Sequence, residues 1–478
     1  MRVAATLAPN NLDPYQSTSY LVDFPYLSPV YDRLTQIQSG PTVAPMLAES
    51  WAFAPDGMSA DFVLRTDARF HDGATVDADA VVGSLRRARD PRFRSASTLS
   101  MVADVSALDE RTVRIVTTRP AADLPYALAS THAAIISPVA LQNGVDLASE
   151  TAGSGPYEID QLRRGDRITY RRSDVYWDPS AQQSARLEII GMTDENARLN
   201  AFRSGQVDLI PVRTGQIDDV EALAKQSQYR VESYPTAMYY SLVFDIGRDG
   251  VDDARVRQAL NYAVDRESIN AGLMNGRCSP TSQPLVSGID GHNPAVERLY
   301  HYDPEKARRL LRDAGLPEGF RLRVVYISGL SPIQEMITAI QAQFAEVGVA
   351  MEMLAMPAGE SQHKFADGGY ETINARVTYA LPSQTLMGAY LVPNYFPTAP
   401  STELSDTIVA SLNPNLGEGE RTQLVSKASG IAAEQAYELF LCGAPTVVGS
   451  SDKVIGLERL GHVDFSGIMD IRYIGKSS

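Results

Sequence analysis

The sequence lacks any long hydrophobic run. No stretch of its 478 residues approaches the roughly 20 consecutive apolar residues that a membrane-spanning helix needs. The residues that follow Met1 and Arg2 are also too polar, and their apolar part too short, to form the hydrophobic region of a signal peptide. We therefore expect either a cytosolic protein or a sequence that begins after a removed signal.

Cysteine and lysine are scarce. Cys278 and Cys442 are the only two cysteines, which excludes a disulfide-rich scaffold and a four-cysteine zinc site. Lysine supplies six of the 43 basic residues, a bias that reflects genome composition rather than function. With 58 acidic residues the net charge is −15. Because so acidic a chain repels phosphate backbones, we do not expect it to bind nucleic acid.

Catalytic motifs are missing as well. The six histidines lie far apart, and no HExxH pair places two of them on one helical face. Residues 361–364 match the SxxK motif of penicillin-recognising enzymes but have no KTG partner, and no GxSxG elbow occurs. The run 475–477 ends like a phosphate loop but lacks its first glycine and its following helix. These absences argue against an enzyme, although a site assembled from distant residues stays open.

The clearest structural pattern lies in the second half of the chain. Asp303 and Pro304 are typical of a helix N-cap and first turn, and Gly315 is typical of the residue that ends a helix. After this helix, hydrophobic spacing predicts a strand at 322–326, a helix at 332–347 and a strand at 349–356. A strand, a helix and a strand joined by short connections form a βαβ unit, which predicts a parallel sheet covered by helices.

The rest of the chain continues this mixture of helices and strands. Its length allows two to four domains, at roughly 100–200 residues each. Its 44% hydrophobic and 21% charged content is typical of a soluble globular protein. Similar patterns predict helices at 77–88, 194–204, 254–275, 403–412 and 420–440, and strands at 207–210 and, last in the chain, 445–448. We therefore expect a multi-lobed α/β protein whose chain crosses between lobes more than once.

Five blocks of the sequence resemble, in order, the signatures of the family-5 solute-binding proteins, the extracytoplasmic receptors of oligopeptide, dipeptide and nickel ABC importers. The first block, LAESWAFAPDGMSADFVLRTDARFHDGATVDADAVVGSLRR, spans 47–87. The others are GSGPY at 153–157 with DVYW at 174–177, the segment 194–210 with its GQVD, RVRQALNYAVDRE at 255–267, and YDPEKARRLLRDAGL at 302–316. The agreement extends from about residue 12 to residue 460.

The resemblance implies a fold. It is an α/β, periplasmic-binding-protein-like fold (type II, cluster C), with two large lobes around a cleft and a smaller third lobe. The ligand is expected between the first and third lobes, which close by hinge bending. The expected boundaries are 1–40, 152–240 and 443–478 for lobe I, 41–151 for lobe II, and 241–442 for lobe III.

The resemblance also implies a function, that of the substrate-binding subunit of an ABC importer. Such a subunit captures a small solute by hinge closure, here a peptide or peptide-like molecule, an opine, a sugar or another polar molecule, and delivers it to a permease. The expected partners are this ligand and the permease and ATPase subunits. The protein is expected as a monomer, in the periplasm or lipid-anchored at the outer face of the cell membrane. No catalytic residue, cofactor or metal ion is implied. The alternatives are a hydrolase or peptidase that uses the same cleft, and a binding-only sensor or chaperone.

The signature residues themselves are best interpreted as structural. Trp51 and Phe53 are expected in the core, and the run 70–73 is expected to form a turn whose glycine has positive φ, without a metal-binding histidine. The aromatic residues of the second block are expected to pack between lobes; these are Tyr157, Tyr176 and Trp177. Ligand specificity must then come from loops that face the cleft.

Three stretches are expected to line that cleft, namely 13–20, 238–240 and the loop 374–384. Aromatic side chains often stack on ligands in this family, which makes Tyr15, Tyr20 and Tyr239 candidate ligand-binding residues. For each of these tyrosines, a place in the core is an equally good interpretation.

The loop 374–384 departs from the family's pattern. In many peptide receptors of the family it resembles W-x-x-D-Y-P-D-P, and its first aspartate binds the α-ammonium group of the peptide. Here Thr378 aligns with that aspartate, Tyr379 aligns with the tyrosine, both acids are missing and Arg376 is present. A threonine offers an ammonium group no charge-assisted bond, whereas an arginine can grip a carboxylate or phosphate. These three residues are therefore expected to bind a carboxylate-, phosphate- or sugar-bearing solute or an N-blocked peptide; a structural salt bridge is the alternative for Arg376.

The two cysteines allow two outcomes. Export, which the resemblance implies, would place Cys278 and Cys442 in an oxidising compartment where a disulfide is possible. The sequence leaves open whether they form that bridge or remain two separate buried thiols.

Overall fold

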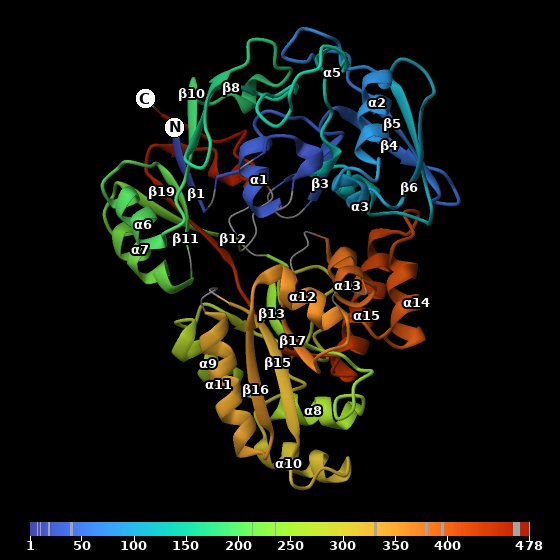
Figure 1. Ribbon diagram of the computed structural model, residues 1–478, viewed down its shortest axis with the longest axis vertical. Coiled ribbons are helices and arrows are strands. Elements are labelled where there is room, and N and C mark those ends of the chain that lie inside the picture. Colours follow the sequence, from blue (N-terminus) through green and yellow to red (C-terminus); the bar gives the residue numbers. More distant parts are fainter. Residues whose placement is uncertain are drawn as a thin grey trace. The chain divides into compact units, whose positions relative to one another are not determined.

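The structure is a computed structural model, and it describes residues 1–6, 8, 9, 11–17, 20–38, 42–212, 214–234, 236–328, 332–377, 381–392, 396–461 and 469–477. At residues 20–22, 214, 358, 359, 375–377 and 418 it describes the backbone alone. The chain forms two compact units (Figure 1). The first comprises 1–234, 413–415 and 446–478, and the second comprises 235–412 and 416–445.

The first unit is built on a mixed seven-stranded sheet. Its central strand β1 pairs in parallel with β10 and β11, and the outer strands are antiparallel. In spatial order the strands are β12 (Tyr229–Tyr234), β19 (Thr446–Ser451), β11 (Leu209–Val212), β1 (Arg2–Ala5), β10 (Arg186–Gly191), β9 (Arg167–Arg172) and β8 (Tyr157–Arg163). The helices of this unit are α1 (Tyr20–Leu27), α2 (Ala78–Ala88), α3 (Ser95–Thr98), α4 (Leu124–Ala127), α5 (Pro138–Gln142), α6 (Glu195–Arg203) and α7 (Ile217–Ala224), with short 3₁₀ turns η1 (Pro14–Gln16) and η2 (Thr131–Ala133).

A second sheet in this unit is fully antiparallel. It contains β4 (Ala48–Phe53), β5 (Ser59–Leu64), β7 (Thr112–Thr117) and β6 (Val102–Ala107), in that order. Helix α2 packs against β6 and β7, because its stripe of valine, leucine and alanine faces the sheet and Asp77 caps its first turn. Two short ribbons complete the unit: β2 (Thr35–Gln38) with β3 (Thr42–Pro45), and β20 (Val454–Ile455) with β21 (Gly475–Lys476).

The second unit contains a six-stranded mixed sheet. Its strands, in spatial order, are β14 (Ser279–Pro280), β18 (Glu438–Gly443), β13 (Tyr239–Phe244), β17 (Thr372–Val377), β15 (Arg321–Ile327) and β16 (Ala350–Met356). Its helices are α8 (Ala254–Tyr262), α9 (Arg266–Leu273), α10 (Pro304–Asp313), α11 (Ile333–Glu346), α12 (Ala358–Ala366), α13 (Pro382–Tyr390), α14 (Thr402–Ser411) and α15 (Glu418–Glu434).

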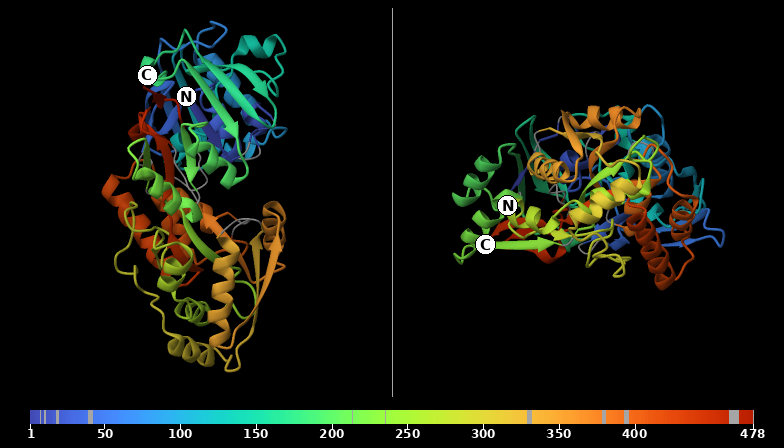
Figure 2. Two further views of the ribbon diagram at one scale, coloured as in Figure 1. Left: turned by 90° about the vertical axis from the view of Figure 1, so that its left-hand side faces the viewer. Right: turned by 90° about the horizontal axis from the view of Figure 1, so that it is seen from below.

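The predicted βαβ unit is confirmed. Strands β15 and β16 pair in parallel over seven residues each, and α11 packs against both of them, as the two views of Figures 1 and 2 show. The preceding helix α10 begins as predicted, with the Asp303 side chain accepting a hydrogen bond from the amide of Lys306 at 2.8 Å.

Two predicted elements are wrong. The single helix expected at 254–275 is two helices, because the side chain of Asp265 accepts a hydrogen bond from the Ser268 amide and caps a second helix there. The helix expected to reach residue 440 ends at Glu434, and after three connecting residues the chain enters β18, the buried strand beside β13, at Glu438. Strand β19 is also not the last, since β20 and β21 follow it.

The residues of the 255–267 signature hold neighbouring segments of the second unit together. Arg266 is buried, and its guanidinium group donates to the carbonyl oxygens of Phe440, Asn261 and Tyr300 at 2.6–3.1 Å. Arg257 binds the carbonyl oxygens of Gln435 and Ala436 in the same way. These bonds join α8 and α9 to the residues that lead into β18 and to the strand itself, as expected of residues that identify the fold rather than bind the ligand.

In the first unit, the signature aromatic residues meet a buried ionic network. Asp32 accepts a hydrogen bond from Trp177 Nε1 and pairs with Arg472, each at 3.0 Å. Arg472 also pairs with Asp470, at 2.9 Å, and Asp470 pairs with Arg33, at 3.0 Å. Through these contacts the C-terminal segment 469–477 is joined to the core of this unit.

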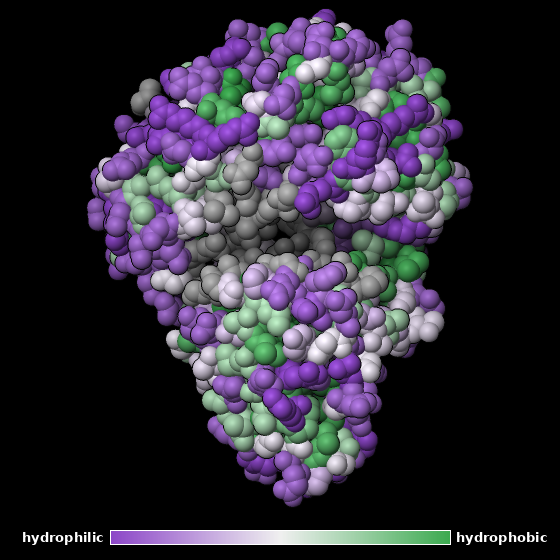
Figure 3. Space-filling view, viewed as in Figure 1, coloured by the Kyte–Doolittle hydropathy of each residue, from purple (hydrophilic) through white to green (hydrophobic). Residues whose placement is uncertain are grey.

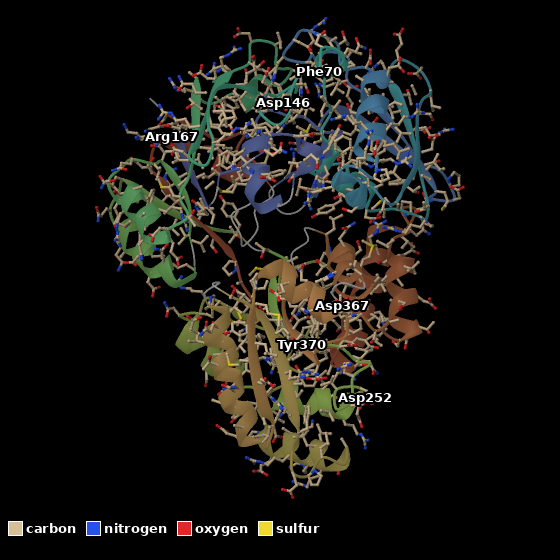
Figure 4. All side chains as sticks on the ribbon, in the orientation of Figure 1. Phe70, Asp146, Arg167, Asp252, Asp367 and Tyr370 are labelled. Atoms are coloured by element: carbon tan, nitrogen blue, oxygen red, sulfur yellow. A yellow bond between two sulfur atoms is a disulfide. The ribbon has the colours of Figure 1, made fainter. Side chains whose placement is uncertain are left out.

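The turn 70–73 forms as predicted. The amide of Gly73 donates to the Phe70 carbonyl at 2.9 Å, and the glycine has φ of 87°. The ring of His71 is paired with the Gly155 carbonyl oxygen at 2.8 Å, so this histidine joins two signature blocks. Trp51 and Phe53 are half-buried against the core, and Figure 4 marks Phe70 within the first unit.

Cys278 and Cys442 form a disulfide, so the first of the two alternatives is correct. Their Cα atoms lie 5.5 Å apart, and the bridge joins the β14 side of the sheet to β18.

The lobes expected from the resemblance relate simply to the two units. Most residues expected in lobes I and II belong to the first unit, and most residues expected in lobe III belong to the second. The expected boundaries between the lobes stay predictions. The further division of the first unit into two lobes stays a prediction.

Candidate functional site

The first segment expected to bind ligand begins at Asp13. This residue is 7% exposed and caps η1, accepting a hydrogen bond from the Tyr15 amide at 2.9 Å. Burial raises the pKa of Asp13, while the Tyr15 amide and the nearby Arg87 guanidinium oppose that rise.

Tyr15 lies in the core. Its side chain is 0% exposed, and its hydroxyl lies 2.8 Å from the Ala134 carbonyl oxygen and 3.0 Å from that of Ser84. Its ring packs edge-on against Phe93, with ring centres 5.9 Å apart. This geometry supports the core interpretation, and a ligand contact by Tyr15 stays a prediction. Tyr20 is the first residue of α1, and its side chain lies outside the described part of the structure.

Next to this segment is a polar group that the sequence analysis missed. The His132 Nε2 atom lies 3.1 Å from the Ser17 carbonyl oxygen, and its Nδ1 atom lies 2.6 Å from the Thr98 hydroxyl. The Ser17 hydroxyl donates to Asp23 at 2.7 Å. Burial lowers the pKa of His132, which favours the neutral ring; in that form Nε2–H donates to the carbonyl oxygen and Nδ1 accepts from the Thr98 hydroxyl. No spacing pattern links residues 17, 23, 98 and 132, so the sequence held no signal for this arrangement.

In the second unit, Tyr239 is also buried. It begins β13, is 0% exposed, and donates a hydrogen bond to Glu438 Oε1 at 3.0 Å. Tyr390, at the end of α13, donates to the same oxygen at 2.6 Å. Tyr239 therefore has a structural partner, and its contact with a ligand stays a prediction.

The loop 374–384 is only partly described. Its first four residues belong to β17, where Arg376 pairs with Tyr240 in the ladder with β13, and its last three belong to α13. The Arg376 side chain and both Thr378 and Tyr379 lie outside the described residues. The predicted contacts of these three residues stay predictions.

The described residues contain neither a candidate metal site nor a membrane-spanning helix. Over the described ranges, no group of three or more histidine, cysteine, aspartate or glutamate side chains is placed to hold a metal ion. Within the same ranges, no helix has the length and apolar character needed to span a membrane. The face of the first unit seen in Figure 3 is mostly hydrophilic.

Sequence comparison places the chain in a family. The profile of bacterial extracellular solute-binding proteins, family 5 Middle, matches residues 42–394. The glutathione-binding protein GsiB of Salmonella paratyphi A is 26% identical over 475 residues, which cover 95% of this chain and 91% of the relative. The glutathione-binding protein GsiB of Escherichia coli K12 matches with the same identity and coverage.

Structural comparison shows the fold. The binding protein AgaA of A. tumefacien R10, solved with agropinic acid, has a TM-score of 0.83 and 24% identity, with 100% of this chain and 99% of that chain covered. Helicobacter pylori DppA, an ABC transporter-associated periplasmic binding protein solved with the peptide STSA, has a TM-score of 0.82 and 22% identity, with coverage of 100% and 98%. The predicted α/β fold of the periplasmic-binding-protein type is thereby confirmed. Since the profile also spans most of the sequence, the chain belongs to family 5 of the bacterial extracellular solute-binding proteins.

Proposed function

We propose that this protein captures a small polar solute by hinge closure and delivers it to an ABC permease driven by ATPase subunits. The observation that carries the proposal is the family match over residues 42–394. We further propose that it acts as a monomer on the outer side of the cytoplasmic membrane, either free in the periplasm or lipid-anchored. DppA, described as a periplasmic binding protein, supports that location.

We also infer that the chain binds its ligand without chemical conversion. The relatives are binding proteins. The arrangement of Ser17, Asp23 and His132 is consistent with this, because the histidine bonds the serine's carbonyl oxygen rather than its hydroxyl. A hydrolase or peptidase would release products from peptides during long incubation, which mass spectrometry of the reaction would detect.

The proposed ligand class follows from the loop 374–384. Arg376, Thr378 and Tyr379, together with Tyr20, are proposed to contact a ligand that carries a carboxylate, phosphate or sugar group, in preference to a free di- or oligopeptide. Arginine matches a carboxylate in a bidentate fork, and threonine cannot replace the lost aspartate as partner of an ammonium group. Agropinic acid, bound by one structural relative, is a carboxylic acid and supports this choice, whereas glutathione is itself a peptide with a free α-ammonium group and does not distinguish the two ligand classes.

Two measurements test the ligand class. Mass spectrometry of small molecules that co-purify with the protein identifies the natural ligand directly. Calorimetric titration then compares that molecule, glutathione and agropinic acid with the peptide STSA and its N-acetylated form. We expect a carboxylate-bearing compound that lacks a free α-ammonium group to bind more tightly than unmodified STSA, and Arg376→Ala to weaken its binding by roughly tenfold or more. The matched control Arg255→Ala, at an exposed arginine of the same unit, is expected to leave binding unchanged.

The contrary result is equally definite. Micromolar binding of unmodified STSA, lost on N-acetylation and unaffected by Arg376→Ala, would contradict the proposed ligand class.

Hinge closure is tested separately by small-angle X-ray scattering, where saturation with a bound ligand should lower the radius of gyration. An unchanged radius with a verified ligand would count against closure.

A further inference from the structure

A carboxyl group is buried in the core of the second unit, and no described cation is paired with it. Glu438, the first residue of β18, is 0% exposed. Its Oε1 atom accepts hydrogen bonds from the hydroxyls of Tyr239, at 3.0 Å, and Tyr390, at 2.6 Å. Its Oε2 atom makes no hydrogen bond of regular geometry with a described residue, although the Ser241 hydroxyl lies beside the carboxyl group. Among the described residues, none of the groups that act on this carboxyl carries a positive charge.

The two tyrosines that bind the carboxyl group belong to an apolar core cluster. The core cluster that contains both tyrosines includes Ile373 from β17, Leu404 from α14 and Ala428 from α15. Within the described part of the unit, the titratable groups that act on Glu438 are Tyr239 from β13 and Tyr390 from α13. The ring of Tyr437 lies behind them, with its centre 6.0 Å from that of Tyr390.

These contacts favour a neutral carboxylic acid. An isolated carboxylate in such a core is costly, because apolar side chains and neutral hydroxyls replace the water that would solvate its charge. The two tyrosine hydroxyls donate to one oxygen and leave the other to carry a proton. In agreement, burial raises the pKa of Glu438 by more than the three hydroxyls lower it.

The acid joins the two elements that adjoin the proposed ligand loop. Tyr239 begins β13 and pairs with Val377, the last residue of β17. The chain then passes through 378–380 and enters α13, whose last residue is Tyr390. Both hydroxyls bind the same oxygen of Glu438, so one side chain fixes the start of β13 and the end of α13 together.

We propose that Glu438, as a neutral carboxylic acid, is a positioning residue that fastens β13 and α13 on either side of the ligand loop. This proposal rests on the proposed function for its reference to a ligand, but the fastening is a property of the free protein. Here, opening means that α13 separates from β18 and exposes Glu438 to water. The exposed carboxyl group then releases its proton, so the opening equilibrium depends on pH.

The pH dependence of the opening equilibrium can be stated as a number. Between the ordinary pKa of glutamate and the higher pKa of buried Glu438, opening releases one proton, so the opening equilibrium rises about tenfold per pH unit. Above the higher pKa the dependence ends. Glu438→Gln keeps an oxygen acceptor for both tyrosines and cannot ionise, so its opening has no such dependence.

Hydrogen–deuterium exchange tests this in the ligand-free, full-length protein. Peptides that cover β13 and α13 are followed from pH 5 upward in the wild type, Glu438→Gln and Glu438→Leu, with rates corrected for intrinsic exchange. We expect wild-type protection to fall about tenfold per pH unit relative to Glu438→Gln, which should match the wild type at the acidic end. Glu438→Leu, which removes the acceptor, should lose protection at every pH.

The control is another acid of the same sheet. Glu371 lies just before β17, next to the labelled Tyr370 of Figure 4, and is paired with Arg323. Glu371→Gln should leave the pH dependence of exchange in α13 as in the wild type.

Two results would overturn the proposal. The first is an equal change of protection with pH in the wild type and in Glu438→Gln. The second is a Glu438→Gln variant that is less protected than the wild type at every pH. Either result means that Glu438 is ionised in the folded protein. Since no ligand is present, this outcome is independent of whether the proposed function holds.

Discussion

At the scale of single residues, the GSGPY signature is explained by lack of space. A Cβ atom on Gly153 would lie 2.1 Å from the Val30 carbonyl oxygen, and one on Gly155 would lie 2.5 Å from that of Pro29. The contacting atoms are backbone, which cannot move aside as a side chain can. The amide of Gly155 also donates to the Val30 carbonyl at 2.8 Å, so the two segments approach closely and are hydrogen-bonded.

Gly153→Ala should therefore destabilise the first unit by about 2–3 kcal/mol, since it forces two hydrogen-bonded backbone segments apart. Urea unfolding followed by tryptophan fluorescence measures the change. Gly83→Ala is the matched control, because Gly83 is exposed in α2 and a Cβ there meets no atom within 4 Å. That substitution should stabilise the helix by roughly 0.5–1 kcal/mol. Equal effects at both positions would contradict the steric explanation.

At the scale of elements, the buried arginines of the 255–267 signature donate hydrogen bonds to backbone carbonyl oxygens instead of pairing with carboxylates. Arg266 has no carboxylate partner in the described structure, and burial lowers its pKa to about 10. Its donors nevertheless bind three segments of backbone, at Asn261, Tyr300 and Phe440. Removing them would leave buried carbonyl groups without partners, each of which costs about 1–3 kcal/mol.

Arg266→Met should accordingly lower the free energy of unfolding of the second unit by at least about 3 kcal/mol. Arg255→Met, in the same signature, removes an exposed pair with Asp253 and an exposed hydrogen bond to the Asp313 carbonyl oxygen, and should lower the urea midpoint far less than Arg266→Met. Circular dichroism of both variants during urea unfolding makes the comparison. A large loss of unfolding free energy in the Arg255 variant, or no loss in the Arg266 variant, would contradict the stabilising role assigned to the bonds between Arg266 and the backbone carbonyl groups.

The disulfide acts at the same scale, because it joins the β14 segment to β18 across 164 residues of chain. Thiol titration of denatured, unreduced protein should find no free cysteine, and two should appear after reduction. The double variant Cys278→Ser, Cys442→Ser should lose about 2–4 kcal/mol of stability, since the unfolded chain regains the freedom of a long loop. Two free thiols before reduction would refute the bridge.

Sequence reasoning succeeded where an element has explicit ends. Helix α10 has its capping Asp303 and its closing glycine, and both were recognisable. It failed where one residue type occurs in two structural positions. Aspartate is found both on the surface of a helix and at a helix N-cap, and Asp265 is the N-cap of α9. Strand β18 was missed because its apolar residues continue the hydrophobic pattern of α15 without a turn signal.

The candidate site was predictable only in part. Blocks that resemble the family gave the segments 13–20 and 374–384, but not which side chains in them are buried. Tyr239 could not be assigned from the sequence, because its partner Glu438 lies 199 residues further along the chain. The same holds for His132, whose contacts at residues 17 and 98 arise only when distant segments meet.

At the scale of the whole molecule, the two units contain buried acids of opposite character. In the first unit, burial opposes the ionised form of Asp470, but the Arg472 and Arg33 guanidinium groups outweigh it and hold the pKa of that carboxyl below its usual value. In the second unit the pKa of Glu438 is raised. A lowered pKa gives stability that is present above the unfolded pKa, near 4, and lost as pH falls through the folded value. A raised pKa gives stability that is present in acid and lost as pH rises.

Acid should therefore weaken the first unit while it favours the second. Both tryptophans, Trp51 and Trp177, belong to the first unit, so tryptophan fluorescence reports on that unit alone. Urea midpoints from fluorescence should fall between pH 5 and pH 2, and Asp470→Asn should reduce that fall while lowering stability at pH 7. Asp61→Asn, which removes the exposed pair with Arg114, should leave the slope nearly unchanged because solvent screens that pair. If Asp470→Asn retains the full wild-type slope, the acid sensitivity of the first unit comes from its surface carboxylates and not from the buried network that joins the C-terminal segment to the core.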